Sequence, residues 1–373
     1  MKAHRLLAPL AAIALLLAGC GDRIDLEDAS TPFALGYDIG DDKRLRVYAI
    51  SAVFSPHAKQ TSVVVSVPSE TARQAREQLD IRSSGIFNGR KLQIVLVGKR
   101  VLEQDSWFRL TDAFFRDSRD ALNQRVAVCD CSLADLMRET PSDEPMLPLL
   151  LKGMIDSGSK RAETANTSLL ELKRQMDDPA VTPAIAEFRF DEHNKIMLSG
   201  TALLDHRGKY AASLGLQESV LLRVLQKEAR NAVGFTVEIP GQPDRSPFVR
   251  NRLSFNSERI HTRIRLTESG RRFRFAVRIR MPIILTERLF PFDSAHRDNE
   301  LERTIGEQTQ AQIDRLIRRI QQDKLDPFGF GLYARAYAYR HFQAVKNDWG
   351  DAFSNAVVDV SVRTSIVSDG PID

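Results

Sequence analysis

A side chain that could do covalent chemistry, the thiol of Cys20, lies near the start of this 373-residue sequence. It follows Leu17-Ala18-Gly19 at the end of an apolar run, and the polar residues Asp22 and Arg23 come almost directly after it. A thiol suits thioether formation because its thiolate is a good nucleophile. The small residues before it would let a membrane enzyme approach the backbone. Whether Cys20 can be modified in this way depends on the segment that precedes it.

The residues before Cys20 have the pattern of a secretory signal. Lys2 and Arg5 are positively charged, whereas residues 6–18 carry no charge. This run is short for a membrane-spanning helix, which needs about 20 residues, but it fits the apolar part of a signal peptide. The quartet ending in Cys20 resembles the lipobox of bacterial lipoproteins. That resemblance implies cleavage after residue 19 and a diacylglyceryl thioether on Cys20. An ordinary signal peptide with a chance cysteine, or an uncleaved anchor, remain the alternatives.

The composition predicts a globular chain after the signal. The formal charge is +4 over the full chain, and removal of Lys2 and Arg5 with residues 1–19 leaves a nearly balanced protein. Hydrophobic residues make up 43% and charged residues 27%, which is typical of soluble globular domains. No second apolar run approaches 18 residues, so we expect no further membrane-spanning segment. The length suggests two or three domains.

Apolar periodicity predicts an α+β fold of two or three tandem mixed domains. Strands alternate with helices from about residue 45 to 139, and proline-marked helices at about 140–180 connect to the second half. That half contains two long basic strands, at about 249–266 and 271–285, and a long helix at about 297–324 that should pack on a long antiparallel sheet. The expected division is a lipoprotein signal peptide at 1–19, an N-terminal domain at 20–180 and a C-terminal domain at 181–373.

No catalytic constellation stands out in the sequence. There is no His-Glu-x-x-His, no Gly-x-Ser-x-Gly and no phosphate-binding loop. Residues 329–334 fit Gly-x-Gly-x-x-Ala, but a turn between two helices explains these glycines better than a dinucleotide site. Cys129 and Cys131 read as two small core residues, because a bridge between i and i+2 in a strand would be strained; redox or metal roles are the alternatives. We therefore expect no enzyme activity, no metal and no cofactor beyond the lipid on Cys20.

The most uneven feature is a pair of arginine-rich strands. Apolar residues such as Ile264 and Phe275 alternate with arginines, so that one face of a sheet would be apolar and the other cationic. The predicted interaction face consists of Arg263, Arg265, Arg272, Arg274, Arg278 and Arg280. Guanidinium groups suit phosphate or carboxylate. Anionic lipid headgroups, or an acidic face of a partner or of the protein's own helix, fit better than nucleic acid; solvated arginines on a half-exposed sheet are the alternative.

Four groups of residues follow one another along the chain in an order that resembles a known family. The first group is Cys20, Asp22, Asp25-Leu26, Gly36 and Asp38, with Gly21 in place of a tryptophan. The second is the segment 89–104, an apolar strand ending in glycine and followed by a helix. The third is Gly200 to Asp205, continuing through Gly208-Lys209, Leu214 and Glu218-Ser219, with Leu204 in place of a phenylalanine. The fourth is Asp326-Pro327, Trp349, Phe353 and the strand 357–367, closing at Gly370.

The family is Ger(x)C, the lipoprotein C subunits of nutrient germinant receptors in endospore-forming bacteria. The resemblance implies tandem α+β domains and a lipid-anchored position at the outer face of the spore's inner membrane. It also implies integral membrane A and B subunits as partners, and a non-catalytic role in nutrient-triggered germination. Of the family's functional residues, only Cys20 carries over. The runner-up function is the lipoprotein solute-binding component of a transporter, which would need two lobes joined by a hinge; a lipoprotein enzyme is the third.

Overall fold

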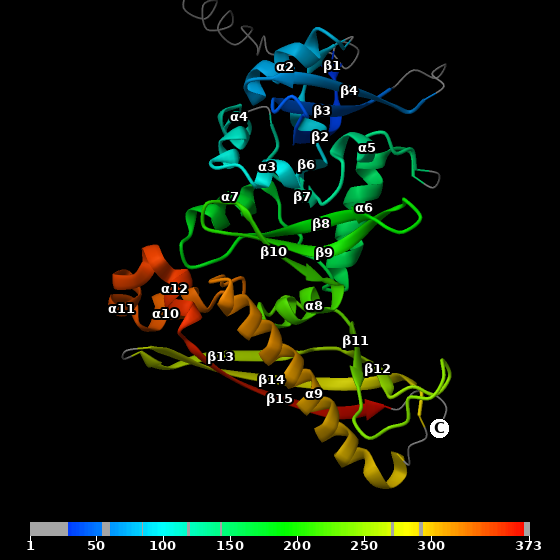
Figure 1. The fold of residues 1–373 in the computed structure, drawn as a ribbon, viewed down its shortest axis with the longest axis vertical. Helices are drawn as coiled ribbons and strands as arrows, with labels where there is room; N and C mark the ends of the chain where they lie inside the picture. Colours follow the sequence, from blue (N-terminus) through cyan, green and yellow to red (C-terminus); the bar gives the residue numbers. More distant parts are fainter. Residues whose placement is uncertain are drawn as a thin grey trace, which may run out of the picture.

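The computed structural model describes residues 29–53, 60–83, 85–117, 120–141, 144–269, 272–290 and 294–368. The predicted signal peptide and Cys20 lie outside these residues. Figure 1 shows an elongated molecule with two large sheets, one in the upper and middle parts of the view and the other at the bottom. The chain is a mixture of helices and strands, as the α+β prediction requires. The predicted fold class is therefore confirmed.

The first sheet has eight strands in the order β10-β9-β8-β7-β6-β2-β3-β4. The four central strands, β8, β7, β6 and β2, are parallel to one another. The pairs on either side of them are antiparallel. β6 is buried along its whole length, which matches its unbroken apolar sequence. The strands are β2 (Pro32–Ile39), β3 (Leu45–Ala52), β4 (Ser62–Ser69), β6 (Ile94–Gly98), β7 (Arg125–Cys129), β8 (Ala184–Phe190), β9 (Ile196–Leu204) and β10 (Tyr210–Gly215). A separate parallel pair joins β1 (Ala29–Ser30) to β5 (Ile86–Phe87).

Helices cover both faces of this sheet, because alternate side chains of its strands point to opposite sides. One core contains Val47 and Val95 with residues from five helical segments, and the other contains Ile94 and Leu96 with residues from two. The first five are α2 (Ala72–Asp80), α3 (Lys99–Leu102), η3 (Trp107–Thr111), α4 (Asp112–Arg116) and α7 (Leu169–Asp177). The other two are α5 (Leu133–Leu136) and α6 (Leu147–Lys160); the short turn η2 (Gly89–Lys91) precedes β6.

The first sheet includes strands from both sides of the predicted domain boundary. β8, β9 and β10 follow residue 181, yet β8 pairs with β7 from the N-terminal half. Helices α6 and α7, from the predicted connection at 140–180, contribute to the two cores of this sheet. The segment is therefore packed against the sheet along both helices, and the division at 180 and 181 stays a prediction.

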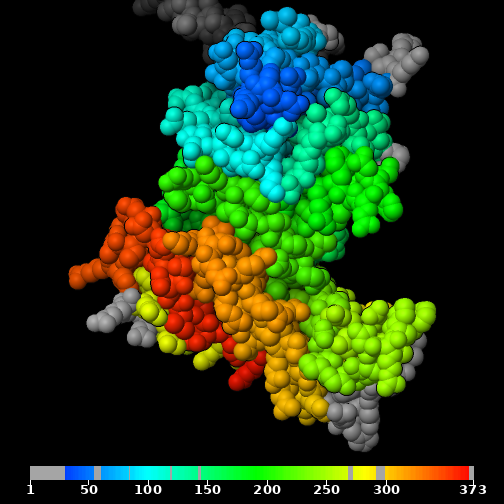
Figure 2. Space-filling model, viewed as in Figure 1, coloured from blue at the N-terminus to red at the C-terminus, as the bar shows by residue number. Residues whose placement is uncertain are grey.

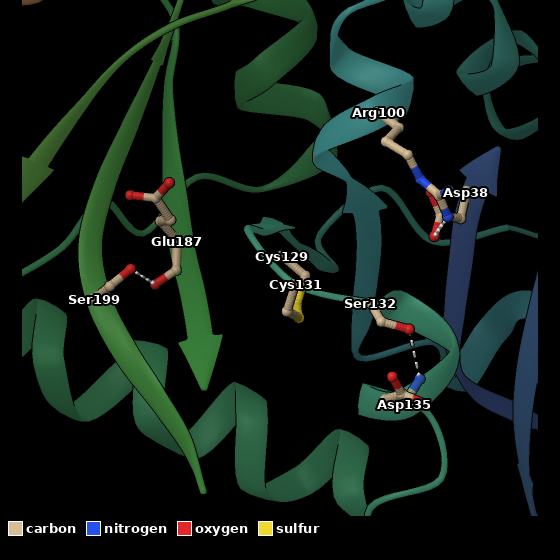
Figure 3. Close-up of a disulfide and its surroundings, with 8 residues drawn as sticks. All are labelled: Asp38, Arg100, Cys129, Cys131, Ser132, Asp135, Glu187 and Ser199. Carbon is tan, nitrogen blue, oxygen red and sulfur yellow. Dashed lines mark hydrogen bonds and ion pairs between the residues drawn. A yellow bond between two sulfur atoms is a disulfide. The ribbon is translucent and has the colours of Figure 1, made fainter. Parts of the chain in front are cut away.

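Cys129 and Cys131 are joined by a disulfide (Figure 3), which corrects the expectation of two unlinked core residues. Cys129 is the last residue of β7 and is buried, whereas Cys131 is half-buried. The strand ends at Cys129, so the chain bends at Asp130 instead of continuing fully extended. That bend brings the two Cα atoms to 5.1 Å, within the range of 4.4–6.8 Å that a disulfide usually spans.

The second sheet forms the C-terminal part of the molecule. β11 pairs with β12, β12 and β13 each pair with β14, all antiparallel, and β15 pairs with the other side of β14 in parallel. The predicted strand at 249–266 is divided by a turn into β12 and β13, which lie one after the other along the same side of β14. The strands are β11 (Val233–Glu238), β12 (Arg252–Ser257), β13 (His261–Ser269), β14 (Phe273–Arg288) and β15 (Val357–Ser368).

Two helices and a helical cluster cover the apolar face of the second sheet. They are α8 (Leu216–Leu225), α9 (Ser294–Gln322), and the cluster of α10 (Phe330–Tyr337), α11 (Tyr339–Val345), η4 (Lys346–Asp348) and α12 (Trp349–Ser354). The apolar stripe predicted for the long helix is confirmed: Leu301, Ile305, Ile313, Leu316 and Ile320 are all buried in one core with the sheet. Figure 1 shows α9 crossing in front of the strands β13–β15.

Asp326 is a buried carboxylate between α9 and α10. It accepts hydrogen bonds from the backbone N–H groups of Gly329, Phe330 and Gly331, at 3.0, 3.1 and 2.7 Å, and from the indole Nε1 of Trp349 at 2.9 Å. Three of these donors lie at the beginning of α10, where backbone N–H groups lack partners within the helix. Burial raises the pKa of Asp326 to about 6, against the opposing effect of these four donors. The residue therefore ties α10 to α12.

Candidate interaction surface

The arginine-rich strands have the two-faced structure that the sequence predicts. Phe273, Phe275, Val277 and Ile279 on β14 are each no more than 1% exposed, and Ile264 on β13 is 5% exposed. These residues belong to the core that also contains α9. The apolar face is therefore fully covered, and the opposite face of the sheet carries the charged side chains.

All six predicted arginines are exposed. Arg263 and Arg265 lie on β13, Arg274, Arg278 and Arg280 on β14, and Arg272 immediately before β14. The structure adds Arg363 of β15, which the sequence reasoning did not include. We name the outward side chains of Arg263, Arg265, Arg274, Arg278, Arg280 and Arg363 the arginine face. Alternation within 357–367 could have placed Arg363 outward, but only the pairing of β15 with β14 brings it beside the others.

The arginine face sets like charges directly against each other. Arg263 of β13 is the register partner of Arg278 on β14, and Arg280 of β14 is the partner of Arg363 on β15. Like charges at directly opposed positions in a sheet lower stability. The arrangement therefore costs the folded protein some free energy unless an anion lies against it.

An acidic side chain of the protein itself neutralises part of this face. Asp359 of β15 accepts from Arg274, with 3.0 Å between Oδ2 and Nη1, and both side chains are about half exposed. An exposed pair of this kind contributes little to stability. Among the residues that the structure describes, Arg263, Arg265, Arg278, Arg280 and Arg363 make no ion pair. Of the alternatives for the arginines, an acidic face of α9 is disfavoured, because buried residues of α9 share a core with the apolar side of the sheet.

A second group of polar residues lies where the parallel strands of the first sheet end (Figure 3). Asp38 on β2 is buried and accepts from Arg100 at 3.2 Å. Glu187 on β8 is buried and accepts from the hydroxyl of Tyr210 at 2.6 Å and from that of Ser213. These carboxylates are satisfied by the protein's own donors. Within the described ranges, no three histidine, cysteine, aspartate or glutamate residues are placed to hold a metal ion.

A groove of about 910 Å³ lies between α2, η3 and α4. Apolar residues such as Leu45 and Leu110 form part of its lining. Two of its arginines pair with neighbouring aspartates: Arg76 with Asp117 at 2.7 Å and Arg116 with Asp112 at 2.6 Å. Because these arginines are already paired with aspartates of the protein, the groove does not indicate a particular ligand.

Comparison with protein families matches both halves of the chain in order. Residues 22–189 match the model described as "Spore germination protein N-terminal domain", and residues 199–370 match "Spore germination B3/ GerAC like, C-terminal". The chain belongs to the GerAC-like family of spore germination proteins. A solved structure entitled "Crystal Structure of the GerBC protein" is similar in fold, with a TM-score of 0.58 and 14% sequence identity over 89% of this chain and 96% of that chain. No curated protein matches the sequence.

The structure gives physical reasons for residues that carried the GerAC-like resemblance. Gly98 ends β6, and a Cβ there would collide with the carboxylate of Asp38 on the adjacent β2. Gly200 has a φ of 139°, which side chains rarely adopt, and it lies against the backbone of β10. Asp326 and Trp349 are joined by a hydrogen bond. These glycines, with Asp326 and Trp349, therefore maintain the fold, and none of these four residues lies on the arginine face.

Proposed function

We propose that this GerAC-like protein is the lipid-anchored C subunit of a nutrient germinant receptor. It would be held at the outer face of the spore's inner membrane by a lipid on Cys20, beside integral membrane A and B subunits. Its contribution to nutrient-triggered germination would be to bind and position partners, without catalysis. The observation that carries the proposal is the ordered match of both family domains over residues 22–370.

The lipobox-like quartet supports the mode of attachment. Among the described helices, none has both the length and the apolar character needed to span a bilayer. Diacylglycerol on Cys20 supplies two acyl chains, and each buried methylene contributes about 0.8 kcal/mol, so two chains hold a protein firmly where one does not. We therefore propose that the lipid on Cys20 inserts into the bilayer and anchors the protein.

The alternative of a transporter's solute-binding component has less support. Such a protein would need two lobes that move about a hinge, and the connecting segment at 140–180 is where the hinge would lie. In the structure, strands before and after that segment pair in one sheet, through β7 and β8. A continuous sheet and two packed helices at this point oppose a hinge motion.

Replacing Cys20 with alanine is expected to abolish lipid attachment completely. Without the thiol there is no nucleophile for the thioether, so incorporation of a labelled fatty acid into the protein should fall to background. The protein should also leave the membrane fraction of the spore after a salt wash. Both are measured on the protein isolated from sporulating cells.

The matched control is the double substitution Cys129→Ala and Cys131→Ala, which removes the other two cysteines of the chain. That variant should retain the lipid label and remain with the membrane. A Cys20→Ala protein that still incorporates the fatty acid would contradict the proposed anchor.

A further inference from the structure

We propose that the arginine face of β13, β14 and β15 is a docking surface for the phosphate headgroups of an anionic phospholipid membrane. The contact is electrostatic and lies in the folded C-terminal part of the chain. It is therefore separate from the acyl chains expected on Cys20. It adds a second point of membrane contact to the proposed function.

The first argument is the charge that the face presents. Where β13 and β15 flank β14, at residues 274–280 of β14, the described outward side chains include six arginines and one aspartate, Asp359, a formal charge of +5. The arginines occupy alternate positions on adjacent strands, so their side chains lie on the same side of the sheet. Guanidinium forks bind phosphate oxygens well, and a layer of anions attracts each basic residue held near its surface.

The second argument is the unfavourable register of the arginines. Arg263 against Arg278, and Arg280 against Arg363, place like charges face to face. Such pairs destabilise a sheet, and in the described part of the chain no acidic side chain pairs with these four residues. An external layer of phosphates would relieve the repulsion at every position simultaneously.

The third argument separates a membrane from an acidic protein partner. Protein interfaces have an apolar centre with aromatic anchors. On the arginine face the residues between the arginines are small, such as Ala276 and Ser361. The exposed large hydrophobic side chains that the structure describes lie elsewhere, apart from Val367 near the end of β15. A headgroup layer needs a cationic surface but no apolar anchors, and this face has that character.

The position of the face is compatible with attachment through Cys20. In Figure 1 α9 lies in front of β13–β15, so the arginine face is turned away from the viewer, on a broad side of the elongated molecule. In the space-filling view from the same side (Figure 2), α9 in orange lies in front of part of this sheet, and β15 in red is visible beside it. Ala29 comes nine positions after Cys20, and nine residues of extended chain reach roughly 30 Å. The protein could therefore lie along a membrane while its lipid is inserted.

The test uses the chain from residue 20 onward with Cys20→Ala, so that no lipid contributes. Its binding is measured by co-sedimentation with vesicles of phosphatidylglycerol and phosphatidylcholine, and with vesicles of phosphatidylcholine alone. We expect binding to the anionic vesicles only. Raising the salt concentration from about 0.05 M to 0.5 M should abolish it, because the Debye length then falls below about 5 Å.

The decisive variant carries Arg263→Ser, Arg278→Ser and Arg280→Ser. Each basic residue near an anionic surface strengthens binding roughly fivefold, so the triple variant should bind at least about a hundredfold more weakly. Its thermal unfolding temperature should be unchanged or higher, since two like-charge contacts are removed. This measurement shows that the loss does not come from unfolding.

The matched control removes the same charge elsewhere, with Arg44→Ser, Arg90→Ser and Arg109→Ser, three exposed arginines of the N-terminal part. It should bind as the parent does. Equal binding by the two triple variants, or no preference of the parent for anionic vesicles, would overturn the proposal. If the parent ignores vesicles and the face variant fails to co-isolate with integral membrane proteins, the partner is an acidic protein and the lipid assignment is wrong. None of these outcomes bears on the lipid at Cys20, so the proposed function is judged separately.

Discussion

Replacing Gly200 with alanine is expected to destabilise the protein by about 4 kcal/mol or more. Gly200 has a φ of 139°, a conformation that alanine adopts only with strain. A Cβ at this position would also lie well under 3.0 Å from the carbonyl oxygen of Leu214, which belongs to the backbone of β10 and cannot move aside. The free energy of unfolding, measured by urea denaturation with circular dichroism, checks this.

The register partner of Gly200 provides the control. Gly215 pairs with Gly200 across β9 and β10, has no neighbouring heavy atom within 4 Å of an added Cβ, and does not have a positive φ. Gly215→Ala should therefore cost no more than about 1 kcal/mol, the typical effect of alanine at a helix N-cap. Equal effects of the two substitutions would show that the close approach of β10 does not limit residue 200.

Replacing Asp326 with alanine is expected to cost about 4 kcal/mol or more. Three backbone N–H groups and the Trp349 indole would lose their acceptor inside the protein. Each buried donor left without a partner costs about 1–3 kcal/mol. The matched control is Asp323→Ala at an exposed position after α9, where we expect a change within about 0.5 kcal/mol. Similar unfolding free energies for the two variants would contradict the assigned role of Asp326.

The raised pKa of Asp326 adds a pH dependence with a definite sign. The pKa of Asp326 in the folded protein is about 6, against an ordinary value of 3.8, so the folded state binds the proton more tightly than the unfolded state. The resulting contribution to stability is fully present below pH 3.8 and is lost as the pH rises through about 6. The stability advantage of the wild type over Asp326→Asn, which does not titrate there, should therefore shrink between pH 5 and 7.5. An advantage that grows over this interval would mean that the four donors outweigh burial.

The local sequence pattern was sufficient to predict which side chains are buried wherever the periodicity of a strand or helix decides burial. The arginine alternation at 272–280 and the stripe of α9 placed Phe275 and Ile313 inward, as the structure shows. β2 was missed, although it is central in the first sheet. Its position depends on parallel pairing with β6 nearly sixty residues later, and such non-local pairing has no signature in a short window.

A short sequence window also does not reveal that Arg363 belongs to the arginine face or that Cys129 and Cys131 are joined. Arg363 joins the arginine face only because β15 returns beside β14. The Cys129–Cys131 bridge depends on a bend at Asp130, which the strand pattern "RVAVCDC" does not reveal. By contrast, the family resemblance rested on the order of short motifs, and both family domains match the chain. Cys20 was predicted from its sequence neighbours alone and lies outside the described residues.

The measurement that tests the central claim most directly is the release of dipicolinate from purified spores after the gene is deleted. Spores of the deletion strain, made in a background without other nutrient receptors, are exposed to a nutrient mixture and, separately, to a non-nutrient trigger. If the protein is a germinant receptor subunit, we expect the nutrient response to be lost and the non-nutrient response to be normal. Returning the wild-type gene should restore the nutrient response. A normal nutrient response in that background would contradict the proposed function.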